Sequence, residues 1–198
     1  MDDGVIETDA VLDFVAGPDS SLSRLVGIDG LAGSGKSSLA ARLAGEIPGA
    51  VVVCVDDFCA LTSDGWWRWA SPSHLRKDVV EPFLRGATVR YRPFDWDTSA
   101  PGPLRTIPPT LMLIVEGVGA LHGLLRERYD VRLWVECPQP VRLARGLERD
   151  GEASRAQWKR WMAEEERYMR KACPQECADL VVSGVDGKIT VTEPGRQP

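Results

Sequence analysis

The sequence contains no asparagine among its 198 residues. Guanine-specific switch proteins recognise their base with an Asn-Lys-x-Asp motif, so this absence excludes a standard GTPase. The chain also lacks an apolar run of the ~20 residues that a membrane helix needs, and we therefore expect no membrane partner. Its acidic N-terminus, MDDGVIETDAVLDFVAG, lacks the basic-then-apolar layout of a secretion signal. Together these absences predict a cytoplasmic protein.

Basic charge and organised cysteines are also scarce. The formal net charge is −5, whereas a protein that binds nucleic acid usually carries a basic surface, so we expect no nucleic-acid partner. The five cysteines are odd in number and follow no framework spacing, which indicates free thiols in a reducing compartment. Cys173 and Cys177 lie four residues apart, but no neighbouring Cys or His completes a zinc site.

Short apolar runs alternate with segments of helical periodicity along the chain. The order of these segments predicts an α/β fold, with about five strands in a mainly parallel sheet and helices on both of its faces. Residues 88–94 alternate like a half-exposed strand, and 98–110 are rich in Pro, Gly and Ser, as in a loop. The expected buried strands are 24–29, 51–55, 111–115, 131–137 and 179–183, and the expected helices are 5–15, 36–47, 73–85, 139–149 and 155–172.

Residues 30–37, GLAGSGKS, fit the G-x-x-x-x-G-K-[S/T] phosphate-binding loop, the Walker A motif. An expected strand precedes it and an expected helix follows it, which is the context that the motif requires. Lys36 would hold the β and γ phosphates, and Ser37 would bind magnesium. A glycine-rich turn that matches by chance is the alternative. Because a GTPase is excluded, we expect ATP, bound by Gly30, Gly33, Ser34, Gly35, Lys36, Ser37 and Ser38.

Carboxylates follow two of the expected strands directly. Asp56 and Asp57 come after 51–55, and a kinase needs a carboxylate beside the acceptor hydroxyl to accept its proton. We expect one of the two aspartates only to cap a turn. Glu116 follows 111–115, where it can reach magnesium directly or through water, or simply begin a helix. Ligands of such sheets collect at the carboxyl ends of the strands, so these groups should share one cleft with the loop.

The ordered set of the P-loop, VDDF, RPFDW, VEGV and an arginine helix ending in Arg149-Asp150 resembles the uridine kinase, phosphoribulokinase and bacterial pantothenate kinase group. The resemblance covers about 24–184 and implies a P-loop NTPase fold with a small helical lid at about 145–160. It implies an ATP- and magnesium-dependent kinase in which Asp56 is the catalytic base and lies near the metal with Glu116. We therefore expect a helical extension over 1–23, the kinase domain over 24–184 and a polar tail over 185–198.

The elements that would bind the acceptor depart from those of uridine kinases. Uridine kinases resemble one another in an aspartate-containing Asp-His-Pro segment that holds the ribose. This chain has WASP there, at residues 69–72, without the acidic residue, and Phe94 stands where tyrosine is usual. Four tryptophans could stack on a flat ring or line an apolar pocket, or two of them could belong to core or lid packing: Trp66, Trp67, Trp69 and Trp96. Arg90 could pair with an anionic acceptor or belong to a solvated face, as could Arg92. The candidate acceptor residues are Asp57, Trp69, Arg92, Phe94 and Asp95.

Arg142, Arg145 and Arg149 recur at helical spacing and so share one side of a helix. In the group that this chain resembles, such arginines cover the transferring phosphate when the lid closes, which gives Arg145 and Arg149 catalytic roles together with Lys36. The alternative is a helix face paired with its acidic neighbours. His74 and His122 belong to no ligand-type cluster and receive no role.

These observations favour a kinase that transfers the γ-phosphate of ATP to a hydroxyl of a small metabolite, with a nucleoside as the first choice of acceptor. A P-loop protein that hydrolyses ATP to regulate a protein partner is the alternative. A nucleoside monophosphate kinase is a third reading, but it would need more arginines to grip a second phosphate. A homodimer is compatible with the sequence, which does not determine the oligomeric state.

Overall fold

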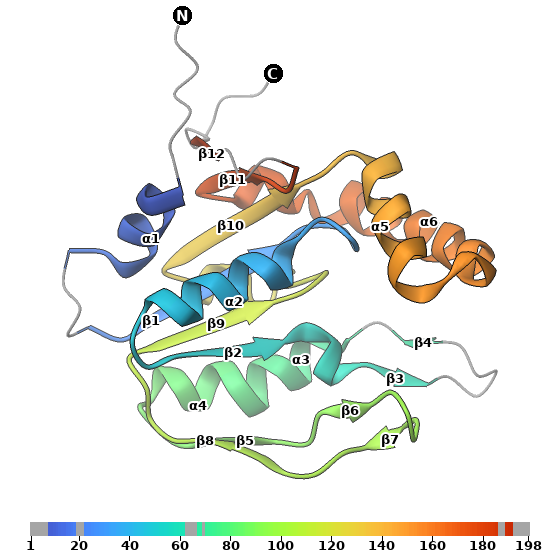
Figure 1. The fold of residues 1–198 in the computed structure, drawn as a ribbon. Helices are drawn as coiled ribbons and strands as arrows, with labels where there is room; N and C mark the ends of the chain where they lie inside the picture. Colours follow the sequence, from blue (N-terminus) through green and yellow to red (C-terminus); the bar gives the residue numbers. More distant parts are fainter. Residues whose placement is uncertain (1–7, 19–21, 62–66, 69, 186–188, 192–198) are drawn as a thin grey trace, which may run out of the picture.

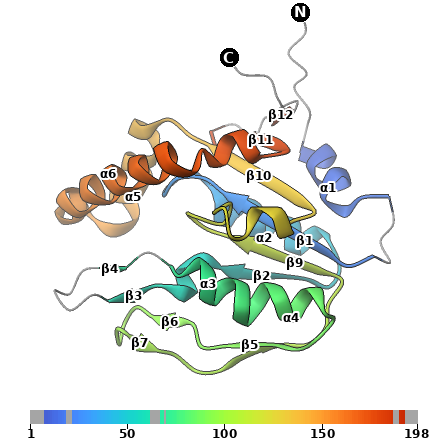
Figure 2. The same ribbon diagram turned by 180° about the vertical axis from the view of Figure 1, so that it is seen from behind.

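The computed structural model describes residues 8–18, 22–61, 67–68, 70–185 and 189–191. At its centre is a six-stranded sheet in the order β12-β11-β10-β1-β9-β2 (Figures 1 and 2). Five strands run parallel, and β12 pairs antiparallel with β11 at one edge. The predicted α/β fold with a mainly parallel sheet is thus confirmed. The strands are β1 (Arg24–Asp29), β2 (Ala50–Cys54), β9 (Met112–Glu116), β10 (Val131–Glu136), β11 (Leu180–Ser183) and β12 (Ile189–Val191).

Helices cover both faces of this sheet (Figures 1 and 2). The helix expected over 73–85 is interrupted by the π turn η2, one turn from Pro82, which has no N–H to continue the regular ladder. The helices are α1 (Thr8–Ala16), α2 (Lys36–Glu46), α3 (Pro72–Leu75), η2 (Arg76–Val80), α4 (Glu81–Leu84), α5 (Gln139–Asp150) and α6 (Arg155–Ala172). Short 3-10 turns are η1 (Val55–Phe58), η3 (Arg126–Arg128), η4 (Glu152–Ser154) and η5 (Pro174–Cys177).

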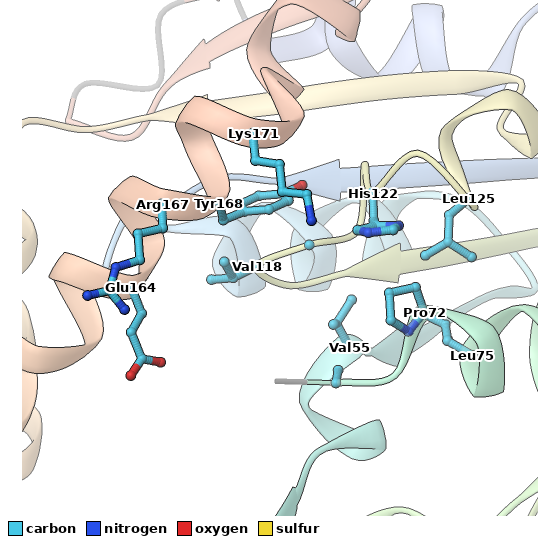
Figure 3. A pocket seen from close by; sticks show the side chains of 12 residues that line it. Val55, Pro72, Leu75, Val118, His122, Leu125, Glu164, Arg167, Tyr168 and Lys171 are labelled. Carbon is cyan, nitrogen blue, oxygen red and sulfur yellow. The ribbon is translucent and has the colours of Figure 1, made fainter. Parts of the chain in front are cut away.

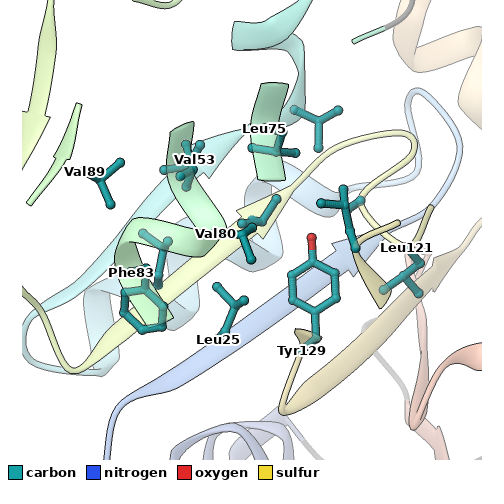
Figure 4. Packing of buried hydrophobic residues seen from close by; sticks show 14 of the residues in the cluster. Leu25, Val53, Leu75, Val80, Phe83, Val89, Leu121 and Tyr129 are labelled. Carbon is teal, nitrogen blue, oxygen red and sulfur yellow. The ribbon is translucent and has the colours of Figure 1, made fainter. Parts of the chain in front are cut away.

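Successive residues of the central strands enter two separate apolar cores, one on each face of the sheet. Leu113 and Val115 join a core with α3, η2 and α4, whereas Ile114 between them joins a core with α1 and α2. Figure 4 shows the first core, in which Phe83 and Val80 face the sheet. Burial on both faces explains why these strands read as continuous apolar runs rather than as alternating ones.

Three small antiparallel pairs lie outside the main sheet: β3 (Ala60–Leu61) with β4 (Trp67–Arg68), β5 (Val89–Tyr91) with β8 (Arg105–Ile107), and β6 (Phe94–Asp95) with β7 (Ala100–Pro101). The half-exposed strand expected over 88–94 is present as β5. Its partner β8 falls within 98–110, where the sequence suggested only a loop. In the same way, β12 lies within the segment expected to be a tail. Strand pairing with a distant segment thus overrides local composition.

The helices α5 and α6 form a hairpin beyond the carboxyl ends of the strands (Figure 1). Gly151 makes the break between them with a φ of 83°, a conformation that favours glycine. This hairpin includes the region expected to be the lid. In the described part of the chain, no helix is long and apolar enough to cross a membrane.

Candidate functional site

The loop between β1 and α2 has the backbone that phosphate binding requires. Gly30, Gly33 and Gly35 adopt φ values of 148°, 77° and 105°. A Cβ on Gly33 would lie 2.7 Å from the carbonyl oxygen of Arg142, so the helix α5 packs directly on the loop. Positive φ at these positions turns successive N–H groups toward one side, where an anion can bind them.

The start of α2 is open for an anion. Gly35 occupies the N-cap without a side-chain cap, and the first turn contains no acidic residue. Its N–H groups are therefore available to an incoming phosphate, and the helix dipole favours negative charge there. The Ser34 hydroxyl is buried without a hydrogen-bond partner among the described residues. Lys36 is only 7% exposed, and its Nζ donates to the Leu31 carbonyl at 3.1 Å across the loop. These residues fit a bound triphosphate.

Ser37 and Glu116 lie together where a magnesium ion would be expected. The Ser37 hydroxyl donates to the Glu116 carboxylate, with oxygen distances of 3.2 and 3.3 Å. Glu116 is 5% exposed, and burial raises the pKa of its carboxyl while Lys36 lowers it. Hydroxyl and carboxylate oxygens suit Mg²⁺, which commonly takes its remaining ligands from phosphate and water. Among the residues described, no group of three or more His, Cys, Asp or Glu side chains could hold a metal without such help.

Asp56 and Asp57, in η1, have different surroundings. Asp57 accepts a hydrogen bond of 2.8 Å from Tyr91 and lies 3.5 Å from Arg105, which in turn donates to the Tyr91 hydroxyl at 2.9 Å. The Asp56 side chain is exposed to solvent and accepts no hydrogen bond from another side chain within the described ranges. Desolvation by the surrounding protein raises the pKa of Asp56. The charge of Lys36 lowers this pKa, and the neighbouring charge of Asp57 raises it.

The arginines of α5 have three different environments. Arg142 is buried and donates to the carbonyls of Cys137 and Ala32 and to Glu165, at 3.1, 3.2 and 3.1 Å. Its role is therefore to position the loop rather than to touch a phosphate.

Arg145 and Arg149 lie closer to the open side of the loop. Arg145 donates to the carbonyls of Gly33 and Gly184 at 3.4 and 2.9 Å. Arg149 is largely exposed and pairs with Asp150, with Nε at 2.7 Å from Oδ1, and its guanidinium lies over the Trp158 ring. Arg145 and Arg149 both line the pocket that contains Lys36.

Sequence reasoning missed Asp29 and Glu165. Asp29 is completely buried at the end of β1 and accepts hydrogen bonds from the N–H groups of Gly30, Gly119 and Leu121 and from the Tyr168 hydroxyl. It thereby joins the loop, the segment after β9 and α6. A charged residue ending an apolar strand was the available signal.

Glu165 lies on α6, far along the chain from the loop that it binds. Its Oε1 accepts from the Ala32 N–H at 2.7 Å. Burial raises the pKa of Glu165, and the Ala32 bond and the Arg142 charge lower it. Nothing in the local sequence distinguishes Glu165 from the other acidic residues of this helix.

The candidate acceptor residues hold the small strand pairs together. Arg92 donates to the Gly102 carbonyl at 3.0 Å, and Asp95 accepts from the N–H groups of Asp97 and Thr98. Phe94 packs edge-on against Trp96 at 5.2 Å between ring centroids. Trp69 and Trp66 lie outside the described residues, as does the side chain of Trp67.

Two pockets open at this edge of the sheet. One, of about 630 Å³, lies over the loop and includes Lys36, Ser37, Arg145 and Arg149, with Val182 on an apolar wall. The second, of about 460 Å³, lies between the ends of β2 and β9 and the helix α6 (Figure 3). Its lining is Val55, Ala70, Pro72, Leu75, Val118, Gly119, His122, Leu125, Glu164, Arg167, Tyr168 and Lys171.

Comparisons with known proteins find similarity to kinases. No family model matches the chain. A uridine kinase of Borrelia garinii subsp. bavariensis is 22% identical over 141 residues, which cover 65% of this chain and 68% of that protein. A candidate uridine kinase structure from Bacillus stearothermophilus has a TM-score of 0.68 at 19% identity and covers 87% of this chain and 95% of its own. A candidate fructose transport system kinase from Silicibacter sp. TM1040 has a TM-score of 0.62 at 24% identity, covering 84% and 95%.

The fold, the phosphate-binding loop and the weak sequence similarity all point to the same group of proteins. The two solved structures share the fold across most of both chains. Sequence and fold together therefore relate this chain to the P-loop small-molecule kinases, the group that includes the uridine kinases.

Proposed function

We propose that the protein transfers the γ-phosphate of ATP to a hydroxyl of a small metabolite. The observation that carries this proposal is the separation of roles between the two aspartates. Asp57 is engaged by Tyr91 and Arg105, whereas the Asp56 side chain is exposed and has no side-chain hydrogen bond within the described ranges, and the charge of Lys36 lowers its pKa. An ATPase needs no unpaired carboxylate there for a substrate hydroxyl, but a kinase does.

The phosphate-binding groups of this proposal come from the loop and α2. The N–H groups at the start of α2 would hold the β and γ phosphates together with Lys36, and Ser37 and Glu116 would hold magnesium. Magnesium, when bound, would neutralise the charge that develops on the transferring phosphate. Arg145 and Arg149 would add positive charge from α5, after Arg145 exchanges its carbonyl partners for phosphate oxygens.

Asp56 is the base in this proposal. Its carboxylate would orient the acceptor hydroxyl and accept its proton as the hydroxyl oxygen attacks the γ-phosphorus and ADP leaves. The helices α5 and α6 would exclude water, which otherwise competes with the acceptor. The proposed location is the cytoplasm, where the five cysteines would stay free thiols.

The test is coupled ADP release by the purified protein with magnesium and ATP, against a panel of nucleosides, sugars and hydroxy acids. We expect strong stimulation by one class of compound. Asp56→Asn should lower the stimulated rate at least ~100-fold, because general-base catalysis contributes about that much. Asp13→Asn, on the exposed side of α1, is the control and should leave the rate unchanged.

A regulatory ATPase would behave differently in the same assay. Its turnover would be slow and uniform across the panel, it would survive Asp56→Asn, and it would rise only when a protein partner is added. That pattern would overturn the kinase proposal.

A further inference from the structure

The pocket between β2, β9 and α6 lies beside the proposed base. Val55 in its wall immediately precedes Asp56, and Val118 and Gly119 follow Glu116 closely in the chain. Its floor is apolar, with Pro72 and Leu125 among the residues that Figure 3 shows. At about 460 Å³ it has room for a small metabolite. One end of a molecule in this pocket would thus lie near Asp56 and the other under α6.

Two cations line the α6 side of this pocket. Arg167 and Lys171 lie one helical turn apart on α6, and neither side chain forms an ion pair or a hydrogen bond in the described part of the chain. Like charges at this spacing repel one another. Glu164, on the same rim, lies 3.8 Å from Arg160, which compensates it from outside the pocket. The α6 wall of the pocket therefore carries two cations, Arg167 and Lys171, and one carboxylate, Glu164, which leaves a net positive charge.

A third donor faces Lys171 from the segment after β9. Figure 3 shows Lys171 extending from α6 toward His122. His122 Nδ1 accepts from the N–H of Leu124 at 3.2 Å, so in the neutral imidazole the proton is on Nε2. Burial lowers the pKa of His122, and the charges of Lys171 and Arg126 lower it further, which favours this neutral form. The pocket thus offers hydrogen-bond donors from both of its sides.

We propose that the acceptor carries an anionic group, which Lys171 and His122 bind while its hydroxyl lies at Asp56, and that Arg167, farther along α6, adds positive charge to the same wall. This inference rests on the proposed function and names the substrate class of that same site. A carboxylate or a phosphate ester has the required charge and acceptor oxygens, and either can take a charge-assisted hydrogen bond from a guanidinium or an ammonium. Tyr168 only lines the pocket, because its hydroxyl is bound to Asp29. The acceptor is therefore a small hydroxy acid or sugar phosphate, not a neutral nucleoside.

Matched pairs of compounds test the charge preference. Glycerate is compared with glycerol, pantothenate with pantothenyl alcohol, and fructose 6-phosphate with fructose, and uridine is added as a neutral nucleoside. We expect an anionic member to have a kcat/KM at least about tenfold above that of its neutral partner, as one charge-assisted bond provides. The first two pairs report on a carboxylate and the third on a phosphate.

Charge-removing variants locate the preference. Arg167→Gln and Lys171→Gln should each raise KM for the anionic acceptor about tenfold or more, with kcat, the KM of ATP and the KM of the neutral partner little changed. Arg170→Gln, on the same helix but outside the pocket lining, is the matched control and should change none of these values. An equal rise in the KM for the anionic acceptor in all three variants would indicate a general electrostatic effect of the charges on α6, and it would overturn the proposal.

The outcomes separate this inference from the proposed function. Asp56-dependent phosphorylation of a neutral compound in preference to its anionic partner would overturn the anionic acceptor but leave the kinase intact. Turnover that no compound stimulates would count against the kinase itself. In that case calorimetry with the same pairs still decides whether the pocket selects anions: failure of every anion to bind better than its neutral partner, or binding that survives Arg167→Gln and Lys171→Gln, overturns the inference.

Discussion

Arg142 and Glu165 form an ion pair of 3.1 Å and share a third residue, Ala32, in the phosphate-binding loop. The guanidinium donates to the Ala32 carbonyl and the carboxylate accepts from its N–H, at 3.2 and 2.7 Å. Both side chains are almost fully buried, with 6% and 2% exposed. Ala32 alone therefore attaches the loop to both helices of the α5–α6 hairpin.

Breaking this ion pair should destabilise the fold. Glu165→Gln leaves the Arg142 charge buried without its partner, and we expect a loss of about 3–5 kcal/mol in the free energy of unfolding, measured in urea. Glu166→Gln, one residue along on the exposed side of α6, is the control and should cost no more than about 0.5 kcal/mol. Equal stability of the two variants would show that the pair is not needed by the fold.

Magnesium dependence should report on Glu116. In Glu116→Gln one metal-binding oxygen loses its charge, so we expect the magnesium concentration for half-maximal ADP release to rise about tenfold or more, with ATP saturating. EDTA should abolish the activity of the wild-type protein. Glu46→Gln, exposed at the end of α2, provides the comparison. An unchanged magnesium requirement in Glu116→Gln would remove Glu116 from the metal site.

The pH profile should identify the base. Only the ionised Asp56 can accept a proton, so kcat/KM for the acceptor should fall as the pH falls through the pKa of Asp56. That pKa is raised above its ordinary value of 3.8 by the surrounding protein, lowered by Lys36 and raised by Asp57. The acidic limb should thus lie above pH 3.8, and Asp57→Asn should move it to lower pH. Because the charge of Arg149 lowers this pKa, Arg149→Gln should move the limb to higher pH. A limb that neither variant moves would assign it to another group.

Two glycine-to-alanine changes should have opposite effects. A Cβ on Gly146 would overlap the Trp158 indole, so Gly146→Ala should cost about 1–3 kcal/mol of unfolding free energy. Gly45, in α2, has no atom within 4 Å of such a Cβ. Gly45→Ala should add about 0.5–1 kcal/mol, because alanine is the better helix former. Thermal unfolding of both variants measures this, and a stabilised Gly146→Ala would mean that the two helices are not in close contact.

The central sheet could be predicted because its signal is local. The run RLVGID is buried on both faces and followed by glycines, and β1 covers the same six residues, Arg24–Asp29. The strand β8 could not be predicted from its Pro- and Gly-rich surroundings, because it forms only through pairing with β5, for example of Tyr91 with Arg105. Local composition carries no information on such a partner.

The same distinction applies to the candidate site. The positions of Lys36, Ser37 and Glu116 followed from a motif and from strand ends, which parallel strands bring to one edge. The contact of Glu165 with Ala32 depends on how the helix α6 packs against the loop, and this packing cannot be predicted from the local sequence. The orientation of Arg167 and Lys171 toward a pocket has the same origin, since a polar helix has several polar faces.

The packing of Trp158 against Gly146 determines how the hairpin can move. The indole N–H also donates to Asp150 at 2.9 Å, and Asp150 holds Arg149, so the two helices cannot slide past each other without breaking this contact. At the other end, Arg142 ties the hairpin to the loop. Under the proposed function, closure over a nucleotide would be a swing of the whole hairpin about its base, and it would bring Arg149 in already oriented by Asp150 and Trp158.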